Sequence, residues 1–588
     1  MALLDVPPTA YRTRFFLRLA GTTYRPLLGT LLLLRLLAGS ALSVPATAAL
    51  CAGTLALWFA LLPAYNLWSS GRYAAQHSAE GVPRVKGRWP GNIDVMLKLA
   101  KDLRAGYVLQ AFDELLDEYG TDTLNTRIMW KDTIITRDDA VMRAIHSTHF
   151  NSFERGPDTN ERMATFLGNG IFATDGEVWK QNRAMIRPFF HKERLSDLQI
   201  VAEHAAEALS ILGAAAAAQR AIDIQDLFQR FTLDAGAAFL CGVRARALAA
   251  PRPVPFAARL GAKGAATDDA FGTFAHAFED VQVRIAMRSR RQALWPLYEM
   301  WADATRPDVE VITGWVKPVV ERALREKRER RARGAPRDAE ERTLLDSLVE
   351  RTDDEEAIRF GILNVLMAAR DTTAGLLSFA TYLLAMHPEV MQRLRHEVLD
   401  TCGASGHPPR EALSALPYMS AVLSETLRLF PGAPMGIRTA REDVLVASPA
   451  HAAPLHIPRG ARINWLTLPL HRRADLWGAD AQAFRPERWL DPQLAARLAE
   501  RPSVYIPFLQ GPRVCPGKEF ALQEASYMLA CLLQRFSRIE LVPEALPKGA
   551  APPAHWKQGK GRQAIEKCWP ATAFTIYVKG GLWVRLHE

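Results

Sequence analysis

Cysteine is sparse in this chain of 588 residues, which has six cysteines and no C-x-x-C pair. A secreted scaffold held by disulfides and a zinc site built from thiolates are therefore disfavoured, and a reducing compartment is indicated. No internal repeat with a period of about 20 to 50 residues is evident, which disfavours a solenoid or a propeller. The sequence also lacks a basic stripe interleaved with aromatic residues, so a nucleic-acid partner is not indicated.

The composition is that of a folded protein with a modest excess of positive charge. Hydrophobic residues make up 49% of the chain, which excludes an intrinsically disordered protein. The 73 basic and 63 acidic residues leave a formal charge of +10. Such a charge is compatible with an acidic membrane surface or an acidic protein partner.

A long uncharged stretch lies near the N-terminus. No charged residue occurs between Arg35 and Arg72, and residues 46–68 are apolar. This length is sufficient for a helix to cross about 30 Å of hydrocarbon. The run is too long and starts too late for a usual signal peptide, and a buried core helix is the other alternative. We therefore expect a membrane anchor region over residues 1–70 and a separate folded domain over 71–588.

The orientation of this anchor is left open by the sequence. Basic residues flank the apolar stretch on both sides, so the positive-inside rule does not discriminate. A shorter apolar stretch, residues 26–37, carries Arg35 and is too short to predict a second span. A re-entrant hairpin with both ends in the cytosol remains an alternative to a single span.

A second long helix is predicted in the middle of the chain. Asp353 and Asp354 are candidate N-caps, and the helix should stop at His387, since Pro388 follows. About 33 residues at 1.5 Å each give a helix of roughly 50 Å. Its middle is apolar nearly all round, so we expect it to cross the protein's centre. A polar group, residues 370–373, interrupts that apolar middle.

The strongest chemical signal is a cysteine near the C-terminus. It lies in the pattern F-x-x-G-x-R-x-C-x-G, formed by Phe508, Gly511, Arg513, Cys515 and Gly517. A thiolate ligand needs a positive, donor-rich setting, which the N-terminus of a following helix supplies. Glycine permits a tight turn and the close approach of backbone to a flat ligand. An arginine can bind an anionic group of that ligand.

With these five positions matched, the sequence resembles the cytochrome P-450 family of haem-thiolate monooxygenases. The resemblance covers roughly residues 92–586. It implies a mainly α fold with a small β region, preceded by an N-terminal membrane helix. It also implies heme b (iron protoporphyrin IX) as the cofactor and Cys515 as the ligand to its iron. Phe508, Gly511, Arg513 and Gly517 would then be cofactor-binding residues.

Further motifs of the family occur in the expected order. Trp179 and Arg183 form W-x-x-x-R, which resembles the helix that meets a haem propionate, and Arg438 lies where the family often places a second such arginine. The E-x-x-R of Glu425 and Arg428 resembles a buried structural network that an arginine of the Phe484–Trp489 stretch completes.

The polar group of the long helix resembles the family's oxygen-activation motif. Thr372 and Asp371 would be the catalytic residues, which hold water and deliver protons for cleavage of the O–O bond. Ala369 departs from the pattern, since the family usually has glycine there. The extra methyl group makes the local shape of the helix an open question.

The resemblance implies insertion of one oxygen atom from O2 into a hydrophobic substrate: a fatty acid, an alkane or a polycyclic aromatic. Electrons would come from a separate NADPH-cytochrome P-450 reductase, with cytochrome b5 as a second candidate donor, because the chain has no room for a flavin domain. We expect the endoplasmic reticulum membrane, with the catalytic domain facing the cytosol. The alternatives are a peroxide-rearranging relative, which the Asp371–Thr372 pair disfavours, and a haem sensor or carrier.

Two stretches refine this resemblance. Residues 167–179 and 187–190 look most like the fungal branch of alkane and fatty-acid hydroxylases. At the C-terminus, two short strand patterns flank Lys579-Gly580-Gly581, which predicts a hairpin.

Overall fold

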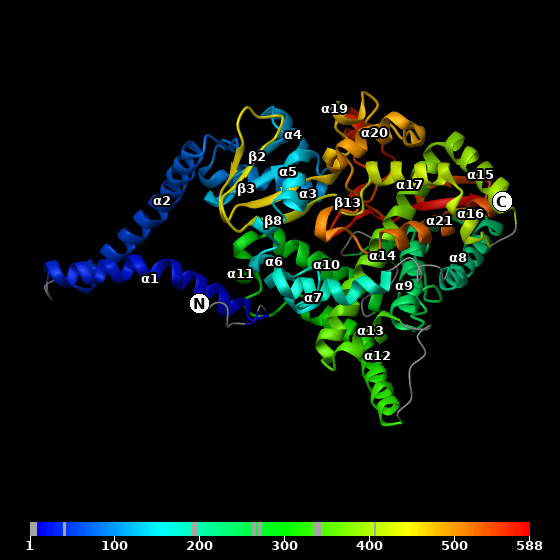
Figure 1. Cartoon of the computed structure of the whole chain (residues 1–588), viewed down its shortest axis with the longest axis horizontal. Coiled ribbons are helices and arrows are strands. Elements are labelled where there is room, and N and C mark those ends of the chain that lie inside the picture. Colours follow the sequence, from blue (N-terminus) through cyan, green and yellow to red (C-terminus); the bar gives the residue numbers. More distant parts are fainter. Residues whose placement is uncertain are drawn as a thin grey trace.

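The computed structural model describes residues 7, 9–38, 43–190, 198–261, 266–267, 273–333, 343–404 and 407–588. Within this part the chain is mainly helical with few, short strands, as the sequence predicts (Figure 1). The helices are α1 (Tyr11–Ala38), α2 (Val44–Gln76), α3 (Ile93–Ala105), α4 (Gln110–Glu118), α5 (Asp139–Arg143), α6 (Pro157–Leu167), α7 (Gly176–Ile186), α8 (Gln199–Ala217), α9 (Ile224–Cys241), α10 (Phe274–Arg290), α11 (Trp295–Tyr298), α12 (Arg306–Ala332), α13 (Leu344–Arg351), α14 (Glu355–Met386), α15 (Pro388–Cys402), α16 (Arg410–Ser414), α17 (Pro417–Leu429), α18 (Thr467–Leu470), α19 (Ala474–Trp477), α20 (Pro492–Glu500) and α21 (Lys518–Arg535).

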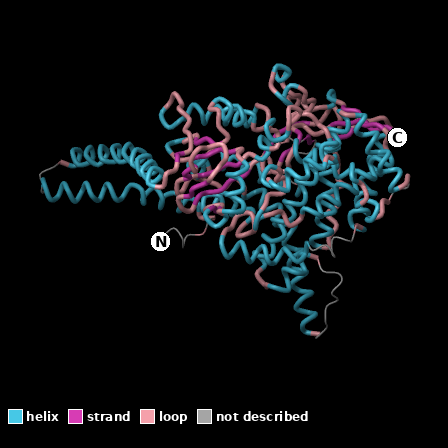
Figure 2. The backbone as a smooth tube through the Cα atoms, turned by 45° about the horizontal axis from the view of Figure 1, so that its top comes forward, coloured by secondary structure: helices cyan, strands magenta, loops and turns pink. Residues whose placement is uncertain are grey.

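The strands form small sheets at the edges of the helical body (Figure 2). They are β1 (Glu80–Gly81), β2 (Thr123–Asn125), β3 (Thr133–Thr136), β4 (Phe153–Glu154), β5 (Ile222–Asp223), β6 (Arg259–Leu260), β7 (Ala266–Thr267), β8 (Gly436–Ala440), β9 (Val444–Val446), β10 (Leu455–Ile457), β11 (Arg462–Trp465), β12 (Arg538–Leu541), β13 (Pro570–Thr572), β14 (Ile576–Val578) and β15 (Trp583–His587). The largest has the order β2-β3-β11-β8-β4, and its register pairs Arg438 with Ile463.

The long central helix is confirmed as α14. The carboxylate of Asp354 accepts hydrogen bonds from the backbone N–H groups of Glu356 and Ala357, which caps the helix as the sequence predicts. The helix ends at Met386, one residue before His387. Between residues 362 and 384 nearly every side chain is buried, and α9, α17 and α21 pack around it.

The predicted C-terminal hairpin is wrong in its pairing. Gly580 and Gly581 do form a turn, with φ angles of 80° and 83°. However, β14 pairs with β13, whereas β15 pairs with β12 and β5. Asp223 directs the chain after the turn, because its carboxylate accepts a hydrogen bond from the N–H of Leu582 at 2.9 Å. The last strand therefore joins β5 and β12 instead of folding back on β14.

The two N-terminal helices project from the body as a pair (Figure 1). Helix α2 is long and apolar enough to cross a membrane, and its most apolar window has no buried residue; α8 also passes this test but is 44% buried there. Helix α2 continues to Gln76, past the expected boundary at residue 70. Helix α1 is also longer than its apolar stretch, since it begins at Tyr11.

The start of α1 and the end of α2 both contact the main body of the protein. At the start of α1, the Tyr11 hydroxyl donates to the backbone carbonyl of Glu299 at 2.8 Å, and Arg18 pairs with Glu161. At the end of α2, the ring of Tyr73 stacks on His456 at 4.7 Å. The chain therefore leaves the body along α1 and returns to it at the end of α2.

Candidate active site

The cysteine motif folds as a tight loop that leads into α21. The backbone N–H of Cys515 donates to the carbonyl of Phe508 at 2.9 Å, which closes the loop. Gly511 has a φ angle of 67°, and a Cβ atom there would collide with the carbonyl oxygen of His146, so only glycine fits. Gly517 is the N-cap of α21, and a Cβ atom there would meet the ring of Phe190 at an ordinary 3.5 Å. The loop thus presents Cys515 at a helix N-terminus, as predicted.

The surroundings of Cys515 act on its sulfur in opposite directions. Burial raises the pKa of the thiol, whereas the N–H of Gly517 and the positive charges of Arg183 and Lys518 lower it. These donors and cations are arranged to stabilise a thiolate once a metal offsets the effect of burial. The side chain of Arg183 donates to the carbonyl of Val514 at 2.6 Å, so it lies on the cysteine loop itself.

A cluster of arginines lies next to this loop. Arg513 pairs with Asp175 at 2.7 Å, and its guanidinium carbon lies 4.4 Å from the ring centre of Trp179. Arg438 is buried with 2% exposure, and burial followed by the charges of Arg155 and Arg513 holds its pKa well below the ordinary value. Burial and Arg513 also lower the pKa of Arg155 to about 10. The three cations therefore lie close enough to repel one another.

This cluster has the charge and the free donors to hold two carboxylates. Three arginines face one acidic partner, Asp175, which leaves two positive charges without a partner in the cluster. Among the described residues, buried nitrogen atoms without a hydrogen-bond partner include Nη2 of Arg438, Nη1 of Arg513, Nε of Arg155 and Nε2 of His146. Buried donors need acceptors, and the two propionates of haem supply them with matching charge. The residues present therefore fit the group.

His146 and Arg155 are cluster members that the sequence analysis missed. His146 lies in the short helical segment after α5, and its ring meets Trp465 edge-on at 4.6 Å. No motif surrounds either residue, and only the β4–β8 pairing brings Arg155 beside Arg438. Of the predicted residues, Arg513, Arg438 and Trp179 come together in the cluster, whereas Arg183 lies on the Cys515 loop.

The polar group of α14 forms a buried charge network. The guanidinium of Arg370 donates to Asp371 on its own helix at 3.0 Å and to Glu279 of α10 at 3.0 Å. The Thr372 hydroxyl donates to the carbonyl of Ala368 at 2.6 Å, and Thr232 of α9 donates to the carbonyl of Arg370 at 3.0 Å. Hydroxyls that bond to helix carbonyls in this way weaken the local ladder.

Three residues on one face of this helix are partly accessible, and we refer to this face as the groove of α14. Between residues 362 and 384, Ala368, Ala369 and Thr372 are the partly accessible positions of an otherwise buried segment. Ala369 also borders α9, since a Cβ atom on Gly236 would lie 4.0 Å from the Cβ of Ala369. The methyl group that the family usually lacks in α14 therefore lies opposite a glycine of α9. This pairing accommodates the departure from the motif without a clash.

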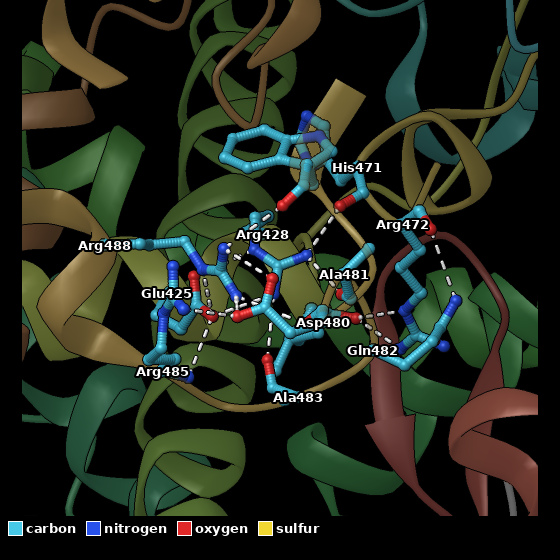
Figure 3. Close-up of polar contacts among 12 residues, drawn as sticks. Glu425, Arg428, His471, Arg472, Asp480, Ala481, Gln482, Ala483, Arg485 and Arg488 are labelled. Atoms are coloured by element: carbon cyan, nitrogen blue, oxygen red, sulfur yellow. Dashed lines mark hydrogen bonds and ion pairs between the residues drawn. The ribbon is translucent and has the colours of Figure 1, made fainter. Parts of the chain in front are cut away.

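The expected Glu–Arg–Arg network is confirmed and fully buried (Figure 3). Arg428 binds Glu425 through two hydrogen bonds of 2.8 Å, and Arg488 donates to the same carboxylate at 2.9 Å. Burial raises the pKa of Glu425, but Arg428 and then Arg488 outweigh it and hold the pKa below its ordinary value. By contrast, the similar pair of Glu356 and Arg359 lies at the exposed start of α14.

Arg428 also ties distant segments together. Its guanidinium donates to the backbone carbonyls of His471, Ala481 and Ala483 (Figure 3). Arg488 reaches Asp480 in the same segment at 3.2 Å. The network therefore fixes the long connection that leads from the sheet to the cysteine loop.

A thiolate loop, a cation cluster and a groove in a long central helix define a haem-thiolate protein. The family model for cytochrome P450 matches residues 91–548, and the chain belongs to this family of monooxygenases. A cytochrome P450 monooxygenase of Talaromyces variabilis, pvhE, is 34% identical over 501 residues, which cover 80% of this chain and 85% of the relative. Cytochrome P450 52A12 of Debaryomyces hansenii is 32% identical over 75% of this chain and 83% of its own length. Cytochrome P450 52A3-B of Candida maltosa is 32% identical over 78% and 85%.

Proposed function

We propose that this monooxygenase inserts one oxygen atom from O2 into a hydrophobic substrate: a fatty acid, an alkane or a polycyclic aromatic. The observation that carries the proposal is the arrangement of Cys515 beside three arginines whose buried, unpartnered N–H groups match the two carboxylates of haem. Heme b is the cofactor that this donor set suits, with Cys515 as its iron ligand. The haem supplies oxygen activation when it is bound.

The residues of the chain have separate tasks in this proposal. Cys515 ligates through its sulfur, and the N–H of Gly517 and the charge of Arg183 stabilise the negative charge on that sulfur. Asp371 and Thr372 hold water in the groove of α14 and move protons toward the reacting oxygen. Apolar side chains around α14 exclude bulk water from this path.

Electrons come from a separate NADPH-cytochrome P-450 reductase in this proposal, with cytochrome b5 as a second donor. The net positive charge of the chain supports an acidic partner. The apolar surface of α2 supports a membrane location, and we propose the endoplasmic reticulum with the catalytic domain in the cytosol. We also propose an anchor region of residues 1–70 and a catalytic domain of residues 71–588, with α2 continuing across this boundary to Gln76.

Turnover tests this function directly. The purified chain, supplied with NADPH and a diflavin reductase, is incubated with a panel of fatty acids, alkanes and polycyclic aromatics under ¹⁸O2. We expect one product with a single labelled oxygen atom by mass spectrometry, and none without the reductase. Conversion of a lipid hydroperoxide without the reductase would favour the peroxide-rearranging alternative. A protein that binds haem but turns over no compound would favour the sensor or carrier.

A further inference from the structure

A cavity lies between α3, α10 and the β13–β14 segment. Its volume is about 250 Å³. Much of its lining is apolar and includes Leu103, Val108, Val283, Ala286, Trp569 and Ala573. Its charged lining residues are two cations, Arg290 and Lys579, and one acid, Asp102. An apolar cavity with cations at its wall suits an amphiphile with an anionic head.

One face of α10 connects this cavity to the groove of α14. Glu279, Val283, Ala286 and Arg290 are spaced i, i+4, i+7 and i+11, so they share a helix face. The last three line the cavity, while Glu279 binds Arg370 next to the catalytic group of α14. Eleven residues of helix span roughly 16 Å. The face of α10 therefore has a cationic end at the cavity and an inner end at α14.

Strand β14 forms a second wall with the same direction. At its inner end, the N–H of Ile576 donates to the carbonyl of Gly432, where a Cβ atom would lie 3.6 Å from Thr372. Lys579 lies three residues further out, about 10 Å along the strand. The strand therefore leads from Lys579 to the neighbourhood of Thr372, while the α10 face leads from Arg290 to Glu279, which binds Arg370 beside Asp371.

Lys579 presents its charge to the cavity at this outer end. Its ammonium lies 3.6 Å from the ring centre of Trp569, and no ion pair joins it to a carboxylate of the described residues. Arg290 adds a second positive charge. It lies close enough to Tyr577 to lower the pKa of that residue, although burial raises it more strongly. Asp102 interacts electrostatically with Lys98, Lys101 and Glu114. This acid therefore lies on the α3 side of the cavity.

We propose that Arg290 and Lys579 bind the carboxylate of a long-chain fatty acid whose methyl end reaches Thr372. This inference rests on the proposed function and selects one of its substrate classes. The enzyme then oxidises the chain end far from the carboxylate. One oxygen atom enters a C–H bond to give a hydroxyl group. The other leaves as water with two protons and two electrons, which NADPH supplies through the reductase.

Calorimetric binding to the holoenzyme tests this subsite with hexadecanoate and methyl hexadecanoate. We expect Lys579→Met and Arg290→Met to weaken binding of the acid by about tenfold or more, and binding of the ester to stay unchanged. Lys557→Met removes an exposed lysine outside the cavity and should change neither. Asp102→Asn should tighten binding of the acid, because it removes the one negative charge of the lining.

The outcomes separate this inference from the function on which it rests. Equal losses for acid and ester, or no loss for either, would overturn the carboxylate subsite and leave monooxygenation intact. Failure of the wild-type enzyme to oxidise any compound of the panel would overturn the function instead. Lys579→Gln keeps the length and polarity of the side chain and serves if the methionine variant fails to fold. In the Lys579 and Arg290 variants we expect oxidation of the acid to lose its preference for the chain end.

Discussion

Asp371 and Glu279 share one cation in the centre of the protein. Arg370 donates to each carboxylate at 3.0 Å, so α14 and α10 are joined at the residue that we propose moves protons. Arg370 is itself buried, with 2% exposure. The charge on Asp371 is therefore set partly by a residue of another helix.

Glu279→Gln should make oxygen use less productive. The variant leaves Arg370 paired with Asp371 alone, which strengthens the hold on that carboxylate and hinders proton transfer. We expect more peroxide and less product for each NADPH consumed. The ratio of NADPH consumed to product formed measures this effect. Glu356→Gln alters an exposed carboxylate and should leave the ratio unchanged; a Glu279 variant with the same ratio as this control would separate Glu279 from proton delivery.

Thr372→Ala should retain haem and lose coupling. The hydroxyl lies in the groove of α14 and bonds to the carbonyl of Ala368, so its removal takes away a hydrogen-bonding group without opening the core. We expect a normal haem spectrum and a large share of reducing equivalents released as peroxide. Thr373→Ala, on the adjacent buried position, is the matched control. Unchanged coupling in Thr372→Ala would remove this residue from the proton path.

Cys515→Ser should abolish the thiolate-type spectrum of the reduced carbon monoxide complex. The sulfur donor is gone, and a hydroxyl oxygen is a poor replacement as a ligand to iron. Cys568→Ser changes a buried cysteine elsewhere and should keep the spectrum. Persistence of the thiolate-type spectrum in Cys515→Ser would refute the ligand assignment.

Glu425→Gln should destabilise the fold strongly. The carboxylate is fully buried and neutralises Arg428 and Arg488, so its removal leaves unpaired buried charge at a cost of about 3–5 kcal/mol. Urea unfolding of the haem-loaded protein measures the change. The exposed pair of Glu356 and Arg359 offers the matched control, since Glu356→Gln should cost less than about 1 kcal/mol. Similar losses in the two variants would show that the network is dispensable.

Glu524 predicts how stability depends on pH. Burial raises its pKa to about 8, above the ordinary 4.5, and the hydroxyl of Thr373 only partly offsets this rise. The folded protein therefore keeps a proton that the unfolded chain releases, so this residue makes stability fall as pH rises from about 4.5 to about 8. Glu524→Gln should raise the thermal midpoint at about pH 8 and change it little near pH 5. An equal effect at both pH values would show that Glu524 does not titrate in this range.

The sequence predicted those features that local chemistry determines. Asp354 and Pro388 set the ends of α14, and the glycine pattern set the loop that carries Cys515. The Glu425 network was also predicted, because its motifs are strong and occur in order. Each of these features depends on residues that are close in the sequence, or on a motif whose interaction partners are themselves recognisable motifs.

Features that depend on distant partners were not predictable in this way. His146 and Arg155 join the cation cluster only through the packing of the sheet. The C-terminal strands have a correct turn, but their pairing is decided by Asp223, more than 350 residues away in the sequence. The docking of Tyr11 on Glu299 likewise has no local signal.

The two attachment points of the N-terminal helices limit how the enzyme can turn on its support. A single helix joined by one linker would let the catalytic body rotate relative to the membrane. Here Tyr11 and Tyr73 attach the helical pair to the body at two separate places, which restricts that rotation. Deletion of the two helices would also remove Arg12 from the backbone carbonyl of Glu299 and Arg18 from the carboxylate of Glu161. A shortened version of this enzyme that simply begins before α3 should therefore lose stability, because the Glu299 carbonyl and the Glu161 carboxylate lose these partners.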